Sequence, residues 1–157
     1  MEFEIIRLSV KDIPFVVEIE KKCFSSPWSE RSFKVSFNCR TAFWFGAVSG
    51  GMLIGFCGAY IVPPEGEIIN IAVDPQFRRK GVGEAMLQKM LDSCCEIAHI
   101  WFLDVRESNV AAQALYKKTG FNVAAKRRDY YSEPPEDAFV MKLDLNNRRL
   151  YDADPFI

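Results

Sequence analysis

The sequence predicts an α/β fold in which one mixed β-sheet carries helices on both of its faces. Runs of β-branched and aromatic residues alternate with amphipathic segments of helical period. They follow the order strand, two helices, three strands, helix, strand, helix and two strands, as in an α/β protein. At 157 residues the chain is expected to bury roughly 70% of the surface exposed on unfolding. We expect one domain over residues 1–145 and a polar, mobile tail over residues 146–157.

The first part of the chain predicts one strand and two helices. Phe3–Leu8 has the composition of a strand, and Asp12–Cys23 has a helical pattern with Asp12 placed as the N-cap. The segment Phe24–Trp28 (Phe-Ser-Ser-Pro-Trp) interrupts that pattern. Ser29 is then the expected N-cap of a short helix that ends near Asn38.

Three strands are expected in the middle of the chain. Thr41–Val48 and Met52–Val62 are rich in aromatic and β-branched residues, and Ser49-Gly50-Gly51 between them predicts a hairpin turn. Pro63–Gly66 is expected to turn the chain into the third strand, Glu67–Val73.

A surface helix and a short strand come next. The buried stripe of this helix is predicted by the apolar residues Val82, Met86, Met90 and Cys94. Ile100–Val105 has the pattern of a short strand. We expect the ligand site in a crevice near this strand and the strand Glu67–Val73.

The last elements are a helix and two strands. Ser108 or Asn109 is expected to cap the helix, and Gly120 to end it in the C′ position. Phe121–Arg128 and Ala138–Leu145 are expected to form a closing antiparallel pair.

The most informative segment is the turn that follows the strand ending at Asp74-Pro75. Its pattern is Arg78-x-x-Gly81-x-Gly83, with a helix beginning at once. Free backbone N–H groups, two glycines and the positive end of a helix dipole form a cradle that suits a pyrophosphate. The spacing differs from both the P-loop and the Rossmann patterns. A solvated turn with a helix-capping glycine is the alternative.

Composition narrows the class of protein. A formal net charge of −1 argues against sequence-independent nucleic-acid binding, and no apolar run approaches the ~18 residues of a membrane-spanning helix. The N-terminus lacks a signal-peptide pattern. Five cysteines without C-x-x-C spacing and a single histidine predict free buried thiols and no metal site. We therefore expect a cytoplasmic protein without membrane or nucleic-acid partners.

Two segments resemble the GCN5-related N-acetyltransferase (GNAT) superfamily, whose central sheet is mixed and mostly antiparallel. Arg78-x-x-Gly81-x-Gly83 matches its acyl-CoA-binding motif, and Leu103–Phe121 matches its second signature. Within the superfamily the chain is similar to RimI-type ribosomal-protein alanine N-acetyltransferases, over Phe3 to Leu145. The features that carry this closer match are Pro27-Trp28-Ser29, Arg127-Arg128-Asp129-Tyr130-Tyr131 and Glu136-Asp137-Ala138.

The resemblance implies acetyl-CoA as donor and coenzyme A as product. Backbone groups of the strand Glu67–Val73 would hold the thioester and pantetheine, and the turn that follows Asp74-Pro75 would bind the pyrophosphate. The residues implied in cofactor binding are Ile71, Ala72, Val73, Arg78, Arg79, Lys80, Gly81, Val82, Gly83, Glu84, Asn109 and Tyr116.

The resemblance also implies catalytic roles. Tyr116 matches the proposed proton donor to the departing thiolate, with a core aromatic of its helix as the alternative. Asp104 stands where the family has a glutamate as general base, so its carboxylate is retracted by about one carbon–carbon bond, ~1.5 Å. It could act through a water, hold the amine by charge, or simply pair with Arg106 or Arg128. Glu67 is the second candidate base, because other superfamily members use a carboxylate there.

For the acceptor, the resemblance implies a protein N-terminus, the N-terminal alanine of a small-subunit ribosomal protein, with direct transfer and no acyl-enzyme. Trp28, Tyr130 and Tyr131 are the expected acceptor-binding residues, with ordinary packing as their alternative. Lys126–Arg128 is expected to be a solvated strand face. The alternative functions are acetylation of a small amine, such as a polyamine or an antibiotic, and a non-catalytic acyl-CoA sensor. Neither oligomeric state nor acyl-chain preference is predicted.

Overall fold

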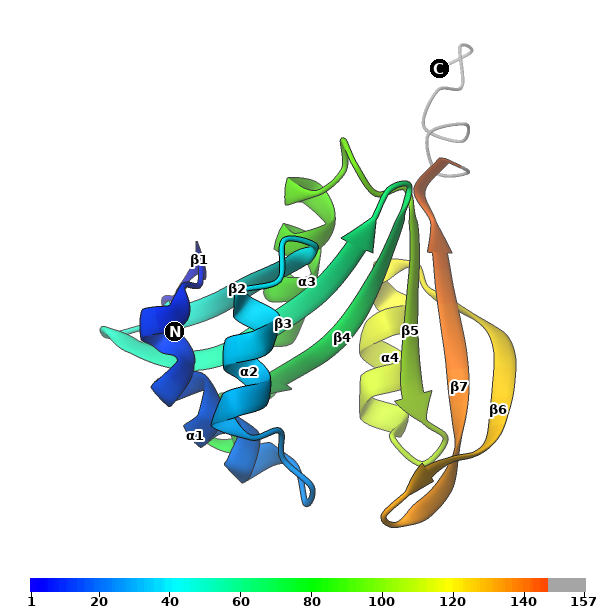
Figure 1. The fold of residues 1–157 in the computed structure, drawn as a ribbon, viewed down its shortest axis with the longest axis horizontal. Helices are drawn as coiled ribbons and strands as arrows, with labels where there is room; N and C mark the ends of the chain where they lie inside the picture. The colour runs from blue at the N-terminus through cyan, green and yellow to red at the C-terminus, as the bar shows by residue number, and fades with distance from the viewer. Residues whose placement is uncertain (147–157) are drawn as a thin grey trace. The chain divides into compact units, whose positions relative to one another are not determined.

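The computed structural model describes residues 1–146, and within them the chain forms the predicted order of elements (Figure 1). The strands are β1 (Glu4–Arg7), β2 (Ala42–Ser49), β3 (Met52–Val62), β4 (Glu65–Val73), β5 (Ile100–Arg106), β6 (Asn122–Ser132) and β7 (Pro135–Asp144). The helices are α1 (Ile13–Cys23), α2 (Glu30–Phe37), α3 (Val82–Ser93) and α4 (Val110–Thr119), with short 3₁₀ turns at Val10–Asp12 and Pro75–Phe77. The predicted tail, from residue 147 on, lies outside the described residues.

The strands form one sheet in the order β1-β2-β3-β4-β5-β7-β6. The pairs β1–β2, β2–β3, β5–β7 and β6–β7 are antiparallel, whereas β4 and β5 are parallel. The predicted class, a mixed and mostly antiparallel sheet in an α/β fold, is confirmed. No helix within residues 1–146 has the length and apolar character needed to cross a membrane.

Contacts divide the chain into two compact units. Unit 1 comprises Met1–Tyr60 and Ile68–Cys94; unit 2 comprises Ile61–Glu67 and the chain from Cys95 on. The single domain expected over residues 1–145 stays a prediction.

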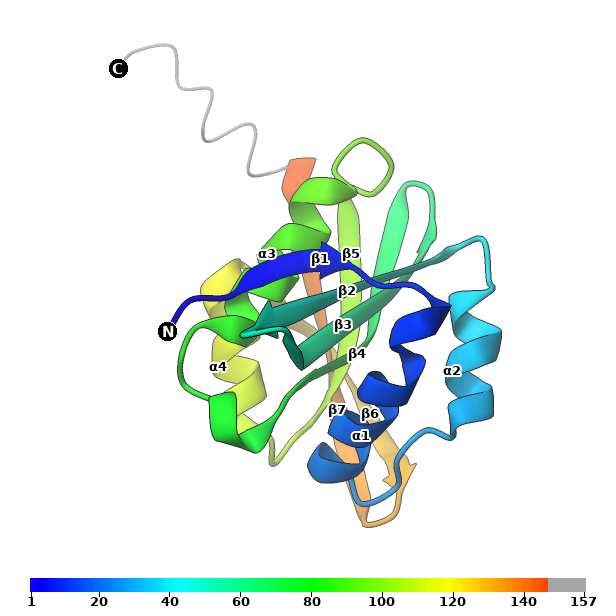
Figure 2. The same ribbon diagram turned by 90° about the vertical axis from the view of Figure 1, so that its left-hand side faces the viewer.

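In unit 1, α1 and α2 lie on one face of the strands and α3 lies on the other (Figures 1 and 2). An aromatic cluster fills the first interface: Trp44 stacks on Phe37 with ring centroids 4.9 Å apart and meets Phe33 edge-on at 5.7 Å. On the other face, a Cβ placed on Gly55 would lie 2.9 Å from the methyl carbon of Met86 in α3. The predicted helical stripe of α3 is confirmed, since Val82, Met86, Met90 and Cys94 are all buried.

In unit 2, α4 lies alongside β5 (Figure 1), and β5 alternates strictly between buried and partly exposed residues. Trp101, Leu103 and Val105 are buried, while Asp104 and Arg106 belong to the opposite face. The parallel register pairs Gly66 with Trp101 and Glu67 with Phe102. The sheet of this unit therefore has an apolar face and a polar face.

The structure corrects two details of the predicted elements and decides a third. β4 begins at Glu65 rather than Glu67, so Gly66 is a strand residue and not part of a turn. Asp12 precedes α1 but does not cap it with its side chain; its Oδ2 accepts the Ser9 N–H at 2.8 Å instead. Of the two candidate caps for α4, Asn109 is used: its Oδ1 accepts the Ala112 N–H at 3.1 Å.

Gly66 is required by the close approach of Trp101. A Cβ at position 66 would lie 2.6 Å from two carbons of the buried indole. We expect Gly66→Ala to lower the free energy of unfolding by about 1–3 kcal/mol, because a rigid buried ring must move. Denaturant unfolding measures this, with the exposed neighbour Glu65→Ala as control and an expected change within about 0.5 kcal/mol. Equal stabilities of the two variants would contradict the packing described.

Candidate functional site

The turn after β4, in unit 1, has the backbone geometry of an anion cradle. Arg79 and Gly81 both have positive φ angles, of 60° and 78°. The hydrogen-bond ladder of α3 begins with the Ala85 N–H donating to the Gly81 carbonyl at 3.0 Å, so the N–H groups ahead of it point out of the helix end. Val82 is the first helical residue and is buried, which fixes this end against the core. The geometry suits a phosphate-bearing ligand.

The basic side chains of the turn differ in direction. The Arg78 guanidinium folds back: its Nε donates to the Val73 carbonyl at 3.2 Å and its Nη2 contacts the Cys23 sulfur at 3.4 Å. Arg79 and Lys80 are exposed, and the Lys80 ammonium lies 5.7 Å from the Phe77 ring. In this structure Arg78 braces the end of β4, while Arg79 and Lys80 are the exposed cations of the turn.

An ion pair anchors the start of the turn to α1. The Lys22 Nζ donates to Asp74 Oδ2 at 2.7 Å, and Asp74 Oδ1 accepts the Gln76 N–H at 3.0 Å. The hydrogen bond from Lys22 is the main reason why the pKa of Asp74 is lowered. The charged carboxylate therefore holds the short 3₁₀ turn that leads into the cradle.

The β4 residues that the resemblance assigns to pantetheine lie just before this turn. Ala72 is buried, whereas Ile71 and Val73 are partly exposed. The Val73 carbonyl also accepts a hydrogen bond from the Cys23 sulfhydryl at 3.3 Å, in addition to that from Arg78.

Glu20 is a buried carboxylate that belongs to none of the sequence motifs. Its side chain accepts hydrogen bonds from the Trp28 N–H at 3.1 Å and from Asn70 Nδ2 at 3.0 Å, and the residue is only 2% exposed. Burial raises its pKa, against the effect of these two hydrogen bonds. Its position on the apolar stripe of α1, one turn after Val16, is the feature of the sequence that indicates burial of this carboxylate.

Trp28, an expected acceptor-binding residue, is held by this carboxylate and by the aromatic core of unit 1. Its ring lies 5.3 Å from that of Phe33 and 6.3 Å from that of Trp44, between centroids. The ring is partly buried and packs on the edge of the core. Packing thus accounts for its position, and its partial exposure leaves a face for other contacts.

The two candidate bases, Glu67 and Asp104, lie together on the polar face of unit 2. Asp104 is two residues after Phe102, which pairs with Glu67, so both carboxylates project from the same side of the sheet. Partial burial and the charge of Asp104 raise the pKa of Glu67, while Arg127 acts in the opposite direction. A raised pKa favours a carboxylate as a proton acceptor near neutral pH.

Arg127 on β6 is the ion-pair partner of Asp104. Its Nε lies 3.3 Å from Asp104 Oδ1. The pairing with Arg106 or Arg128 considered from the sequence is wrong, because the described ion pairs of Asp104 involve Arg127 alone. The strand Lys126–Arg128 is exposed as predicted, but Lys126 is also paired, with Glu107 at 3.0 Å and Asp137 at 3.4 Å.

The two expected acceptor-binding tyrosines follow Arg127 where β6 departs from regular pairing. The register shifts between Arg127 and Tyr131, and Asp129 has a positive φ of 51°. The Tyr130 and Tyr131 rings are nearly perpendicular, with centroids 5.0 Å apart. Burial, and then the charge of Asp104 together with a hydrogen bond to it, raises the pKa of Tyr130. These side chains therefore border the carboxylate pair.

The remaining candidates, Asn109 and Tyr116, lie just before α4 and within it, in unit 2. The side chain of Asn109 caps this helix. Tyr116 is 6% exposed, and its ring centroid lies 6.1 Å from that of Phe121. Gly120 ends the helix with a φ of 108°, as predicted.

The predicted candidates thus fall into two groups. Unit 2 brings together Glu67, Asp104, Tyr130 and Tyr131, whereas the cradle and Trp28 belong to unit 1. Of the cysteines, Cys57 and Cys94 are buried as predicted, but Cys39 is exposed. Among residues 1–146, no group of three or more potential metal ligands occurs.

Comparison with known proteins places the chain in a family. Residues 13–121 match the model of the Acetyltransferase (GNAT) family. The chain is 37% identical over 143 residues to the ribosomal protein bS18-alanine N-acetyltransferase of Escherichia coli (strain K12), covering 88% of this chain and 95% of that protein. It is 34% identical over 143 residues to the N-alpha-acetyltransferase RimI of Mycobacterium tuberculosis, covering 87% of this chain and 89% of that protein.

The fold agrees with these relationships. The crystal structure of the ribosomal-protein-S18-alanine N-acetyltransferase from Escherichia coli superposes with a TM-score of 0.85 at 34% identity, covering 92% of this chain and 94% of that one. The glycine-bearing cradle and the second signature segment both fall within the family match or end with it. The chain therefore belongs to the GNAT family of acetyltransferases, which use acetyl-CoA as acetyl donor.

Proposed function

We propose that the protein transfers the acetyl group of acetyl-CoA to the α-amino group of a protein N-terminus, the N-terminal alanine of a small-subunit ribosomal protein. The observation that carries this proposal is the similarity, over most of both chains, to relatives named for that reaction. The pair of carboxylates bordered by tyrosines in unit 2 supports it. The carboxylates attract a cationic amine, and the tyrosine rings offer a surface on which the peptide can pack. As ribosomal proteins are made and assembled in the cytoplasm, the proposal includes that location.

The chemistry requires one bond to form and one to break. The neutral amine nitrogen attacks the thioester carbonyl, the carbon–sulfur bond breaks, and the products are an N-acetylated chain and coenzyme A. An α-amino group titrates near ~7.7–8.0, so it must lose a proton to react. We propose direct transfer, since no cysteine stands at the catalytic positions of the signature segment Leu103–Phe121.

The two carboxylates suit different tasks. The pKa of Glu67 is raised, which favours it as the acceptor of the amine proton. Asp104 is mostly buried and its Oδ1 is engaged by Arg127, which makes it the poorer proton acceptor; the negative charge that it adds beside Glu67 helps to hold the ammonium. The sequence ranks Asp104 first as base; its shorter side chain and its ion pair favour the holding role instead. Tyr116 is the proposed proton donor to the thiolate, supported by its place in the signature.

The cradle fits the diphosphate of acetyl-CoA. Gly81 has a positive φ, and a Cβ there would meet nothing within 4 Å, so the turn is open to a ligand. Arg79, Lys80 and the first N–H groups of α3 would hold the anion, with Arg78 bracing the strand end.

We expect Gly81→Ala to weaken acetyl-CoA binding several-fold: a side chain at φ +78° costs about 1 kcal/mol or more of backbone strain, the free turn relieves it by leaving this conformation, and binding must restore it. Gly50→Ala is the matched control: its φ is +57°, and its Cβ would also meet nothing within 4 Å, but it lies in the β2–β3 turn. Calorimetric titration with acetyl-CoA should show weakening in the first variant alone. Equal affinities of both variants and the wild type would contradict the assignment of the cradle.

The proposed acceptor is tested by measuring thiol release from acetyl-CoA. We expect release with peptides that begin with alanine, and none with the same peptides blocked at the α-amine. Lysine side-chain peptides and polyamines should be poor acceptors. Activity on a polyamine without activity on alanine peptides would establish a small-amine acetyltransferase. Thermal stabilisation by acetyl-CoA without thiol release for any acceptor would point to a sensor.

The division of labour between the carboxylates is tested by pH–rate profiles. We expect Glu67→Gln to lower kcat by about 10²-fold or more. It should also remove the fall in kcat at low pH, the acid limb of the pH–rate profile. Asp104→Asn should raise the acceptor KM and keep that limb, moved to lower pH, because the charge of Asp104 raises the pKa of Glu67. If Asp104→Asn removes the limb and Glu67→Gln retains it, Asp104 is the base.

A further inference from the structure

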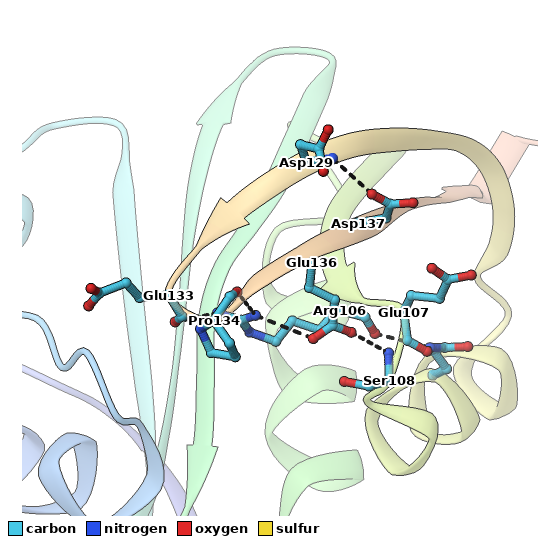
Figure 3. A network of polar contacts seen from close by, with 9 residues as sticks. Arg106, Glu107, Ser108, Asp129, Glu133, Pro134, Glu136 and Asp137 are labelled. Atoms are coloured by element: carbon cyan, nitrogen blue, oxygen red, sulfur yellow. Dashed lines mark hydrogen bonds and ion pairs between the residues drawn. The ribbon is translucent and has the colours of Figure 1, made fainter.

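Arg106 ends β5 two residues after Asp104 and reaches the turn between β6 and β7. Its Nη2 donates to the Glu133 carbonyl at 2.9 Å, and its Nη1 donates to the Pro134 carbonyl at 3.0 Å. The same Nη1 lies 3.3 Å from Glu136 Oε1. Figure 3 shows these contacts converging on the guanidinium from the hairpin. The Arg106 side chain thus binds the tip of the β6–β7 hairpin to the end of β5.

Glu136 extends this network to the start of α4. Its Oε2 accepts the Ser108 N–H at 2.6 Å, next to the capping residue Asn109 (Figure 3). From α4 itself, Gln113 Nε2 donates to the carbonyls of Arg106 at 3.1 Å and Glu107 at 2.9 Å. Charge-assisted hydrogen bonds of Arg106 and Glu136 therefore fix the hairpin to the end of β5 and to the residue before the helix cap, and the neutral amide of Gln113 fixes the helix that carries Tyr116 to the end of β5.

The guanidinium also supports one of the acceptor-side tyrosines. Arg106 Cζ lies 4.1 Å from the ring centroid of Tyr131, a cation–π distance. Tyr131 in turn packs edge-on against Tyr130, which borders Asp104. The side chains of Arg106 and Glu136 are 28% and 19% exposed, so this pair is shielded more than a surface ion pair.

We propose that Arg106 and Glu136 are positioning residues for the acceptor: they hold the hairpin and Tyr131 in the arrangement that binds the peptide N-terminus. This inference rests on the proposed function. It predicts that loss of either side chain changes acceptor affinity far more than acetyl-CoA affinity, because Arg106 and Glu136 bind the hairpin directly and none of their described contacts involves the turn Arg78–Gly83. Arginine is required at position 106, since a planar fork serves two carbonyls, a carboxylate and a ring, whereas a lysine ammonium is a single point charge.

The test compares steady-state kinetics of Arg106→Gln, Arg106→Lys and Glu136→Gln with an alanine-terminated peptide. Each variant should raise the peptide KM by about tenfold or more, the order expected for loss of a charge-assisted hydrogen bond, and change the acetyl-CoA KM by no more than about twofold. The double variant Arg106→Gln/Glu136→Gln should cost less than the sum of the two changes. Arg7→Gln is the matched control: Arg7, on β1 of unit 1, also makes a cation–π contact, with its Cζ 4.8 Å from the Phe43 ring centroid, and should leave both KM values unchanged.

A peptide KM within twofold of wild type in Arg106→Gln would overturn the inference, as would parallel rises in both KM values. Lowered thermal stability with both KM values unchanged would assign the pair a structural role and also overturn it. Glu136→Gln, which preserves shape, carries the test if the arginine variants fail to fold. Absence of peptide acetylation by the wild-type protein would refute the proposed function instead.

Discussion

The parallel pairing of β4 with β5 is the constraint on which the candidate site depends. Its register sets Glu67 opposite Phe102, and the alternation of β5 then puts Asp104 on the same face. A slip by one residue would bury Asp104 and expose the indole of Trp101. Gly66 permits the pairing, because its missing side chain leaves room for that indole. The register of β4 and β5 thus determines both the packing of the core and the placement of the two carboxylates.

Charge balance on this polar face follows from that register. Two carboxylates on one side of a sheet repel each other, which contributes to the raised pKa of Glu67. β6 supplies Arg127 as the counter-charge of Asp104, while β5 supplies Arg106 for Glu136 on β7. Because Arg127 pairs with Asp104, Glu67 remains available for an incoming amine. Arg106 pairs with Glu136 and fixes the hairpin beside these carboxylates. The side chain of Asp104 is one carbon shorter than that of a glutamate, but Glu67 supplies a glutamate carboxylate on the same face of the sheet.

Local signals made most of the fold predictable. Ser29 caps α2 through a hydrogen bond to the Ser32 N–H, and Gly120 ends α4, because caps depend on a few neighbouring residues. The sequence predicts a turn at Gly66, and this prediction is wrong because the residue that requires a glycine there, Trp101, is distant in sequence. The ion pairs Arg127–Asp104 and Arg106–Glu136 are not predictable for the same reason: charge spacing does not show which strands lie side by side. Motif order identified the family, whereas side-chain partners required the register.

The most direct measurement is a crystal structure with a bisubstrate conjugate that joins coenzyme A, through an acetyl linker, to the α-nitrogen of an alanine-terminated peptide. We expect the α-nitrogen within about 3.2 Å of the Glu67 or Asp104 carboxylate, directly or through one water, with the peptide beside Tyr130 and Tyr131. The diphosphate should lie on the turn around Gly81. An α-nitrogen bound away from both carboxylates would contradict the catalytic role assigned to this polar face.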